Sequence, residues 1–207
     1  MKFIGFYNYT VILTYMSLFS GVLGMKLAYD GRLTLAICCL MFSGICDMFD
    51  GVVARSKKDR TDDEKGFGIQ LDSLCDVICF GVLPAVILYF SGIDTILGTV
   101  LLMYYILCAV IRLAFFNVIE TKRQMSEDGC VKAYRGLPVT SSAIIFPFFY
   151  FVSELLPSGA ITVIYYILPF LIGTLFITDV RIPKLDVTRL WRKSCKTEEL
   201  DSEEVHI

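Results

Sequence analysis

The sequence predicts an all-α integral membrane protein with six transmembrane helices. Of its 207 residues 56% are hydrophobic, and the mean hydropathy is +0.65, whereas soluble domains are about 45–50% apolar. Apolar runs of about 20 residues recur along the chain, the length that a helix rising 1.5 Å per residue needs to cross about 30 Å of hydrocarbon. Most charged residues lie outside these runs, in two loops and a C-terminal tail.

The first two predicted spans are joined by a short turn. Residues 9–28 and 33–54 are predominantly apolar, and Lys26 and Arg32 are the basic residues near the turn between them. The first run is long enough to span, so we interpret it as a helix and not as a cleavable signal peptide. The segment that follows the second span, residues 55–68, reads RSKKDRTDDEKGFG and is predicted to be a charged loop.

The next two spans are joined without a charged loop. Residues 69–91 and 95–118 flank Gly92, a turn residue, and the short connection between them carries no Lys or Arg. After the fourth span the composition changes again. Residues 119–136, IETKRQMSEDGCVKAYRG, are predicted to form a second charged loop.

The last two spans complete the predicted domain. Residues 138–156 and 160–178 are separated by a turn that contains Pro157. The remainder of the chain is polar and ends in an acidic run, which is typical of a solvated tail. We therefore expect one six-helix transmembrane domain over residues 1–180, which carries whatever site the chain has, and a polar cytoplasmic tail over residues 181–207.

The basic residues predict the orientation in the membrane. They are concentrated in the two charged loops and the tail, and the opposite side has only Lys26 and Arg32. The positive-inside rule then places both termini and both loops in the cytoplasm, with the protein in the cell membrane. The one histidine, His206, is penultimate, which excludes most histidine-dependent chemistry. Six of the eight cysteines lie in apolar runs without metal-ligand spacing, so we expect packing residues and not disulfides. No nucleic-acid partner is expected.

Two pairs of aspartates interrupt the apolar pattern. Asp47 and Asp50 lie three residues apart at the end of the second span, and Asp72 and Asp76 lie four apart at the start of the third. Each spacing places both carboxylates on one helical face. Because one loop joins the two spans, they are expected to be antiparallel neighbours. Four carboxylates could then converge just inside the cytoplasmic surface.

Four close carboxylates must be neutralised, and a divalent metal with hard oxygen ligands (Mg²⁺, Mn²⁺ or Ca²⁺) would do this. Two metals about 4 Å apart can clamp the entering and leaving oxygens of a phosphoryl displacement. An alternative is structural, with the carboxylates capping helix ends and pairing with the basic loop. Another is a cation transporter or channel. Intramembrane carboxylates are more often functional, and their position at the cytoplasmic ends favours an enzyme.

Small residues lie beside the acidic pairs. Gly51 follows Asp50, and Ala54 lies two turns after Asp47 on the same face, which leaves room for a bulky ligand. Gly68 precedes the second pair by one turn. Arg55 is suited to pair with a phosphate group.

This pattern resembles the CDP-alcohol phosphotransferase family. Members carry two aspartates, Gly and Ala-Arg, then Gly and two further aspartates. This chain has the same order, although the gap between Arg55 and Gly68 is longer than is usual in the family. The matching residues are Asp47, Asp50, Gly51, Ala54, Arg55, Gly68, Asp72 and Asp76.

The resemblance implies a six-helix membrane fold, usually a homodimer, with two divalent cations and a CDP-linked lipid substrate. It implies that Asp47, Asp50 and Asp72 are metal ligands, and that Asp76 both binds metal and acts as general base. The residues that would line the CDP pocket are Asp47, Gly51, Ala54, Arg55 and Gly68.

The flanks of the motif bear on the acceptor alcohol. Ser73 after the third aspartate, and Phe80-Gly81 and Pro84 after the fourth, resemble the members that transfer the phosphatidyl group of CDP-diacylglycerol to serine, giving phosphatidylserine and CMP. Val77 directly follows the fourth aspartate, where members with phosphorylated acceptors usually have a basic residue. Inositol, glycerol 3-phosphate or an amino alcohol stay open as alternative acceptors.

Three further residues are candidates for contacts with the acceptor or the lipid phosphate. Arg112 lies well inside the fourth span, where an unpaired charge is costly. It would bind a phosphate or the serine carboxylate, or else form a structural ion pair. Arg135 is a phosphate anchor or simply a positive-inside residue. Ser73, next to Asp72, is the third candidate.

Overall fold

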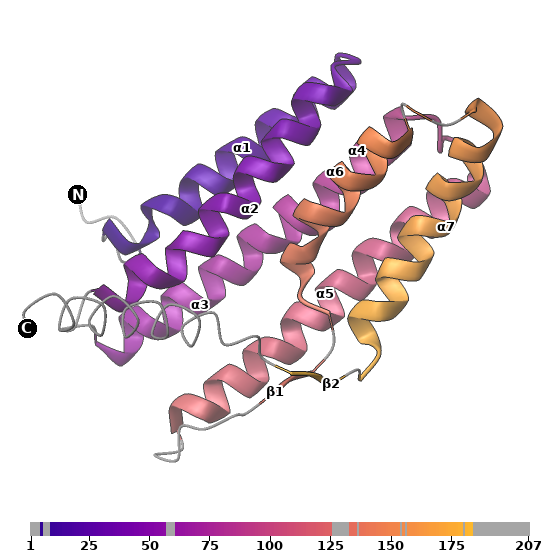
Figure 1. The fold of residues 1–207 in the computed structure, drawn as a ribbon. Coiled ribbons are helices and arrows are strands. Elements are labelled where there is room, and N and C mark those ends of the chain that lie inside the picture. Colours follow the sequence, from indigo (N-terminus) through magenta and orange to yellow (C-terminus); the bar gives the residue numbers. More distant parts are fainter. Residues whose placement is uncertain are drawn as a thin grey trace, which may run out of the picture.

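The computed structural model describes residues 5, 9–56, 61–125, 133–135, 137–153, 155, 157–179 and 181–183. Within these ranges the regular elements are helices and helical turns, apart from two short paired strands. The long helices lie side by side with their axes roughly aligned (Figure 1). The α1–α2 turn lies at one end of this bundle, and the C-terminal end of α2, the N-terminal end of α3 and the strand pair lie at the other.

The first two helices form a closely packed antiparallel pair. A short 3₁₀ turn, η1 (Tyr9–Val11), leads into α1 (Ile12–Tyr29), and α2 (Leu33–Ser56) follows. Gly31 has a φ of 77°, a conformation that favours glycine, and it closes the turn between them. At Gly24 a Cβ atom would lie 3.0 Å from the Cβ of Cys39, so the absent side chain allows the two backbones to approach.

The third apolar stretch consists of three consecutive helical segments. These are α3 (Asp62–Asp76), a π-helical turn η2 (Val77–Val82) and α4 (Leu83–Phe90). The predicted loop over residues 55–68 is therefore wrong in its second half. The helix begins earlier because Thr61 and Glu64 form a capping box, in which each side chain accepts a hydrogen bond from the other residue's backbone N–H.

The fourth long helix also extends beyond its predicted end. The structure has α5 over Ile96–Met125, whereas the sequence predicted a charged loop from residue 119. Glu, Lys, Arg and Gln are good helix formers, so the helix continues after its apolar part. Strand β1 (Ala133–Arg135) then pairs with β2 (Arg181–Pro183) in antiparallel register, which the sequence analysis did not predict.

Two helices, α6 and α7, complete the bundle. A 3₁₀ turn, η3 (Val139–Ser141), precedes α6 (Ser142–Ser153), and α7 (Ser158–Ile177) packs against α5 (Figure 1). Four helical stretches among the described residues are long and apolar enough to cross a bilayer: Ile12–Tyr29, Leu33–Gly51, Asp62–Phe90 and Ile96–Thr121. Two further apolar helices are shorter, Val139–Ser153 and Ile161–Ile177.

The core lies where η2 and α4 meet α5, α6 and α7. Its largest fully buried side chains include Tyr105, Phe80, Phe176 and Ile37. Many large apolar side chains are instead exposed on the outside of the bundle, among them Phe19 and Ile96. An exposed apolar surface of this extent is expected of helices that face lipid. The six described cysteines are free thiols: Cys38, Cys39, Cys46, Cys75, Cys79 and Cys108.

Candidate active site

The four predicted aspartates lie together where α2 and α3 are adjacent. Carboxylate oxygens of Asp47, Asp50 and Asp72 all lie within 4.8 Å of one another. Asp76 is within hydrogen-bonding range of Asp47, and Asp50 of Asp72. The helical spacing explains this arrangement, because residues three or four apart share one face and the two faces oppose each other.

The chemistry of this cluster fits a hard divalent cation. Asp76 is only 8% exposed, and the other three carboxylates are partly buried. Among the described residues the ion pairs that the structure shows are Lys26–Asp30 and Lys65–Asp62, and neither involves the cluster. Converging carboxylates that no cation of the described residues neutralises are suited to bind Mg²⁺ or Mn²⁺ through oxygen.

Helix α1 contributes a residue that the sequence analysis missed. The buried side chain of Thr14 makes a hydrogen bond with Asp50. A threonine hydroxyl can donate to a carboxylate and orient it. Thr14 lies in an apolar run, so its only sequence signal is that it is a polar residue on the buried face of a predicted span.

Polar contacts next to the acidic cluster join α1, α2 and the π-helical turn η2. Ser43 Oγ in α2 donates to the backbone carbonyl of Ser17 in α1 over 3.0 Å. The thiol of Cys79, in the π-helical turn, donates to the same carbonyl over 3.3 Å. Ser43 is one turn before Asp47 and Cys79 is three residues after Asp76. The helices that carry the carboxylates are therefore bound to α1 immediately beside them.

The π-helical turn η2 begins directly after Asp76. In an α-helix the carbonyl of Phe80 would accept from the amide of residue 84, but Pro84 has no N–H. Tyr105 in α5 replaces this donor, because its hydroxyl donates to Phe80 O over 2.6 Å. The same hydroxyl lies 2.9 Å from Ser142 Oγ, at the start of α6. Two neighbouring helices thus hold the turn that follows Asp76.

The small residues of the predicted CDP pocket are only partly within the described structure. Gly51 is exposed, and a Cβ atom built there would meet no atom of the described residues within 4 Å, so this part of the structure leaves the space beside it open. Gly68 is half-buried in α3. Ala54 and Arg55 belong to the last turns of α2, but their side chains lie outside the described part.

Of the three acceptor candidates, Ser73 and Arg112 have described side chains, whereas only the backbone of Arg135 is described. Ser73 is buried, and its hydroxyl donates to Asn117 Oδ1 in α5 over 2.7 Å. Asn117 Nδ2 in turn donates to Gln70 Oε1 over 3.4 Å. This chain of bonds ties the Asp72 region of α3 to α5. Arg135 lies in β1 opposite Arg181, and its side chain is outside the described structure.

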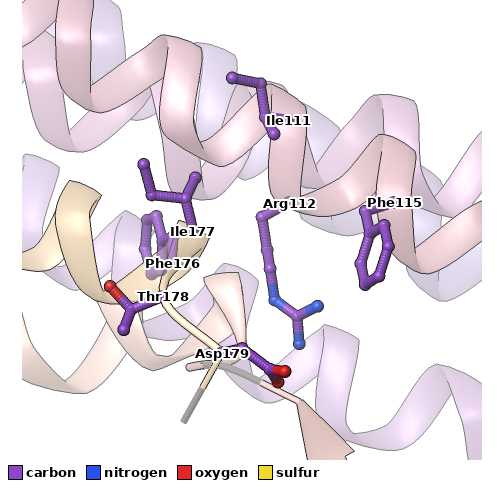
Figure 2. Close-up of a pocket in the computed structure, with 7 residues that line it drawn as sticks. All are labelled: Ile111, Arg112, Phe115, Phe176, Ile177, Thr178 and Asp179. Carbon is purple, nitrogen blue, oxygen red and sulfur yellow. The ribbon is translucent and has the colours of Figure 1, made fainter.

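The third candidate, Arg112, is buried beside a separate cavity. Its Nε donates to the carbonyl of Leu137 over 3.3 Å, and only 7% of the residue is exposed. The cavity, of about 240 Å³, lies between α5 and the end of α7, and Figure 2 shows the guanidinium group directed toward the carboxylate of Asp179. The residues that line it are Ile111, Arg112, Phe115, Phe176, Ile177, Thr178 and Asp179.

Arg112 lies at about the same depth in the bundle as Asp76. The contact between Ser73 and Asn117 marks one level at which α3 meets α5. A second level is marked by Gly81, where a Cβ atom would lie 3.5 Å from the Cβ of Ala109. Asp76, at the end of α3, lies between these two levels, and so does Arg112 in α5.

Comparison with known proteins adds a family assignment to this geometry. A family model described as CDP-alcohol phosphatidyltransferase matches residues 7–176. An archaetidylserine synthase from Methanothermobacter thermautotrophicus is 34% identical over 179 residues, which cover 84% of this chain and 69% of that protein. A CDP-diacylglycerol–serine O-phosphatidyltransferase from Methanocaldococcus jannaschii is 32% identical over 171 residues, 83% of this chain and 71% of that protein.

A more distant organism supplies a third relative. A CDP-diacylglycerol–serine O-phosphatidyltransferase from Saccharomyces cerevisiae is 38% identical over 103 residues, which cover 48% of this chain and 35% of that protein. No solved structure gives a significant match.

Proposed function

Because this chain belongs to the CDP-alcohol phosphatidyltransferase family, we propose that it transfers the phosphatidyl group of CDP-diacylglycerol to the hydroxyl of L-serine. The products are phosphatidylserine and CMP, and the enzyme is a CDP-diacylglycerol–serine O-phosphatidyltransferase. The single observation that supports the chemistry best is the convergence of Asp47, Asp50 and Asp72 within 4.8 Å, with Asp76 beside Asp47. The names of the relatives support serine as the acceptor.

The proposal includes a setting in the membrane. The four long apolar stretches and the two shorter helices together make six crossings, with both termini and the acidic cluster on the cytoplasmic side of the cell membrane. The positive-inside distribution of Lys and Arg supports this orientation. The enzyme works as a homodimer, as the resemblance to the family implies.

The acidic cluster holds two divalent cations, Mg²⁺ or Mn²⁺, with Ca²⁺ as another possible occupant. Asp47, Asp50 and Asp72 are the ligands, and Asp76 completes the set. Thr14 orients Asp50 through its hydrogen bond. When bound, the cations supply positive charge that stabilises the pyrophosphate oxygens as CMP departs.

The side chains of the protein perform the proton transfer and the positioning. The serine hydroxyl oxygen attacks the phosphatidyl phosphorus, and a new P–O bond forms while the bond from that phosphorus to the bridging oxygen of CMP breaks. Asp76 accepts the hydroxyl proton, and CMP leaves as a phosphate monoester. The buried position of Asp76 keeps its carboxylate out of bulk water, and η2 fixes its direction.

The nucleotide and the acceptor approach from different sides of the cluster. We assign CDP to the open space above Gly51, with Asp47, Gly68, Ala54 and Arg55 as the other lining residues. The acceptor side is formed by Arg112, Ser73 and Arg135. The Ser73 hydroxyl donates a hydrogen bond to Asn117 Oδ1, so its oxygen can still accept a hydrogen bond from the acceptor.

An acceptor panel tests the proposal. Purified protein with CDP-diacylglycerol and Mn²⁺ should release CMP when serine is added. Inositol, glycerol 3-phosphate and ethanolamine should each give far less CMP. Turnover with glycerol 3-phosphate and none with serine would reject the acceptor assignment. A Mn²⁺ flux across sealed vesicles, without CMP release from any acceptor, would instead support a cation transporter.

A further inference from the structure

The cavity between α5 and α7 holds one positive and one negative side chain in a wall that is otherwise mainly apolar. Arg112 and Asp179 both line it, beside aromatic and aliphatic groups from Phe115, Phe176 and Ile177 (Figure 2). The two charged groups do not form a direct ion pair with each other, as judged from the described residues. They face the same space while remaining separate, which leaves room for a ligand that carries both charges.

One hydrogen bond to a backbone carbonyl fixes Arg112 in place. Its Nε donates to Leu137 O, and the N–H of Leu137 donates to Leu175 O in α7 over 3.5 Å. The peptide of Leu137 thus connects the arginine to α7. Among the described residues the terminal guanidinium nitrogens of Arg112 make no hydrogen bond or ion pair, and their planar set of donors matches a carboxylate.

Asp179 adds a negative charge to the cavity, which a pocket for a purely anionic ligand would not contain. A pocket for a phosphorylated acceptor would be lined by cations alone, and a carboxylate beside it would repel the ligand. A free α-amino acid carries an ammonium and a carboxylate on one carbon atom, so it matches a carboxylate and a guanidinium that share one cavity. The volume of about 240 Å³ greatly exceeds the share of about 30 Å³ that one water occupies in the liquid, so a serine-sized molecule fits.

We propose that Asp179 binds the ammonium group of the acceptor while Arg112 binds its carboxylate, so that this cavity selects an α-amino acid. The inference rests on the proposed function, because it identifies the acceptor pocket of that reaction. Arg112 lies at the depth of Asp76, so an acceptor held here lies at the level of the general base. Ethanolamine would lose the contact with Arg112, and 3-hydroxypropionate would lose the contact with Asp179.

The test compares acceptor constants for the full chain and its variants, in the presence of CDP-diacylglycerol and Mn²⁺. Asp179→Asn should raise the KM for serine roughly tenfold or more, the loss expected when one charge-assisted hydrogen bond is removed. The KM for CDP-diacylglycerol should change much less. The preference for serine over 3-hydroxypropionate should decrease, because the variant no longer has a carboxylate that binds the ammonium group. Asp179→Glu should recover part of the serine affinity.

Asp94→Asn is the matched control. Asp94 is an exposed aspartate in the connection between α4 and α5, at the other end of the bundle, and its removal should leave both KM values unchanged. An Asp179→Asn variant with the wild-type KM for serine, or with an equal rise in the KM for CDP-diacylglycerol, would overturn the inference.

The experiment distinguishes a failure of the Asp179 inference from a failure of the proposed function. If the wild-type protein uses serine and Asp179→Asn keeps its affinity, the inference fails and the proposed function stands. If the wild-type protein does not use serine at all, both fail. Should Asp179→Asn not fold, competition in the wild type decides. Homologous zwitterions such as threonine should then compete with serine far better than 3-hydroxypropionate or ethanolamine, and equal competition by all of them would contradict the inference.

Discussion

Replacing Tyr105 with phenylalanine removes one hydroxyl group from the buried core and leaves the ring in place. Tyr105 is 0% exposed, and its hydroxyl donates to Phe80 O over 2.6 Å. Pro84 has no N–H, so the carbonyl loses the donor that replaces the missing amide. The same change leaves Ser142 Oγ without its 2.9 Å contact. Because the ring stays, the loss should come from the hydrogen bonds and not from a cavity.

The change in the free energy of unfolding depends on whether the Phe80 carbonyl keeps another hydrogen-bond donor. Hydrogen bonds between membrane helices average about 0.6 kcal/mol, whereas a buried acceptor without any partner costs about 1–3 kcal/mol. We therefore expect Tyr105→Phe to lower the free energy of unfolding by about 1–2 kcal/mol. At about 2–4 °C per kcal/mol for a chain of this size, the Tm should fall by about 2–8 °C.

The assay is thermal unfolding of the purified protein in detergent, with Tyr104→Phe as the matched control. The hydroxyl of Tyr104 contacts Thr174 Oγ1 over 3.2 Å at a half-buried position, where other partners can replace it. Its loss should lower the Tm by a smaller amount. Because η2 directly follows Asp76, Tyr105→Phe should also reduce kcat. Equal Tm values for the two variants would refute the role of Tyr105 as the replacement donor for Phe80.

Three further predictions concern the close packing, the nucleotide space and the metal ligands. Gly44→Ala should destabilise the protein by about 1–3 kcal/mol, because the new Cβ would lie 2.5 Å from the Cβ of Ala143 and overpack the contact of α2 with α6; an unchanged Tm would show that the helices can move apart freely. Gly51→Val should leave the Tm nearly unchanged, since no atom of the described residues lies within 4 Å of the new Cβ, but should raise the KM for CDP-diacylglycerol in steady-state assays; an unchanged KM would exclude the space above Gly51 as the nucleotide site. Mn²⁺ at one hundred times its Kd should stabilise the wild type by about 2.7 kcal/mol and so raise its Tm. Asp72→Asn should remove most of this rise in Tm. A full rise in that variant would exclude Asp72 as a ligand.

The acidic cluster could be predicted from the sequence because its geometry is local. Spacings of three and four residues place each pair on one helical face, and a single short connection brings the two helices together. The early start of α3 was also present in the sequence, since Thr61 and Glu64 have the spacing of a capping box. Here the charged composition of residues 55–68 suggested a loop, and the local capping signal determined the structure instead.

Other parts of the site depend on contacts between distant segments and could not be predicted in this way. Thr14 reaches Asp50 through the packing of α1 on α2, which is close at Gly24, where a Cβ atom would lie 3.0 Å from the Cβ of Cys39. Asp179 follows the last helix and reads as the start of a polar tail, and it joins Arg112 only through the packing of α7 on α5. The π-helical turn likewise needs Tyr105, 25 residues away from the carbonyl that it satisfies.

The most direct test of the account measures both products of the transfer in one reaction. Purified protein in detergent or liposomes, with CDP-diacylglycerol, Mn²⁺ and labelled serine, should form labelled phosphatidylserine and CMP in equal amounts. Asp76→Asn should keep the fold, as judged by its Tm, and form neither product. Release of CMP without labelled lipid, or full activity of Asp76→Asn, would contradict serine as the acceptor or Asp76 as the general base.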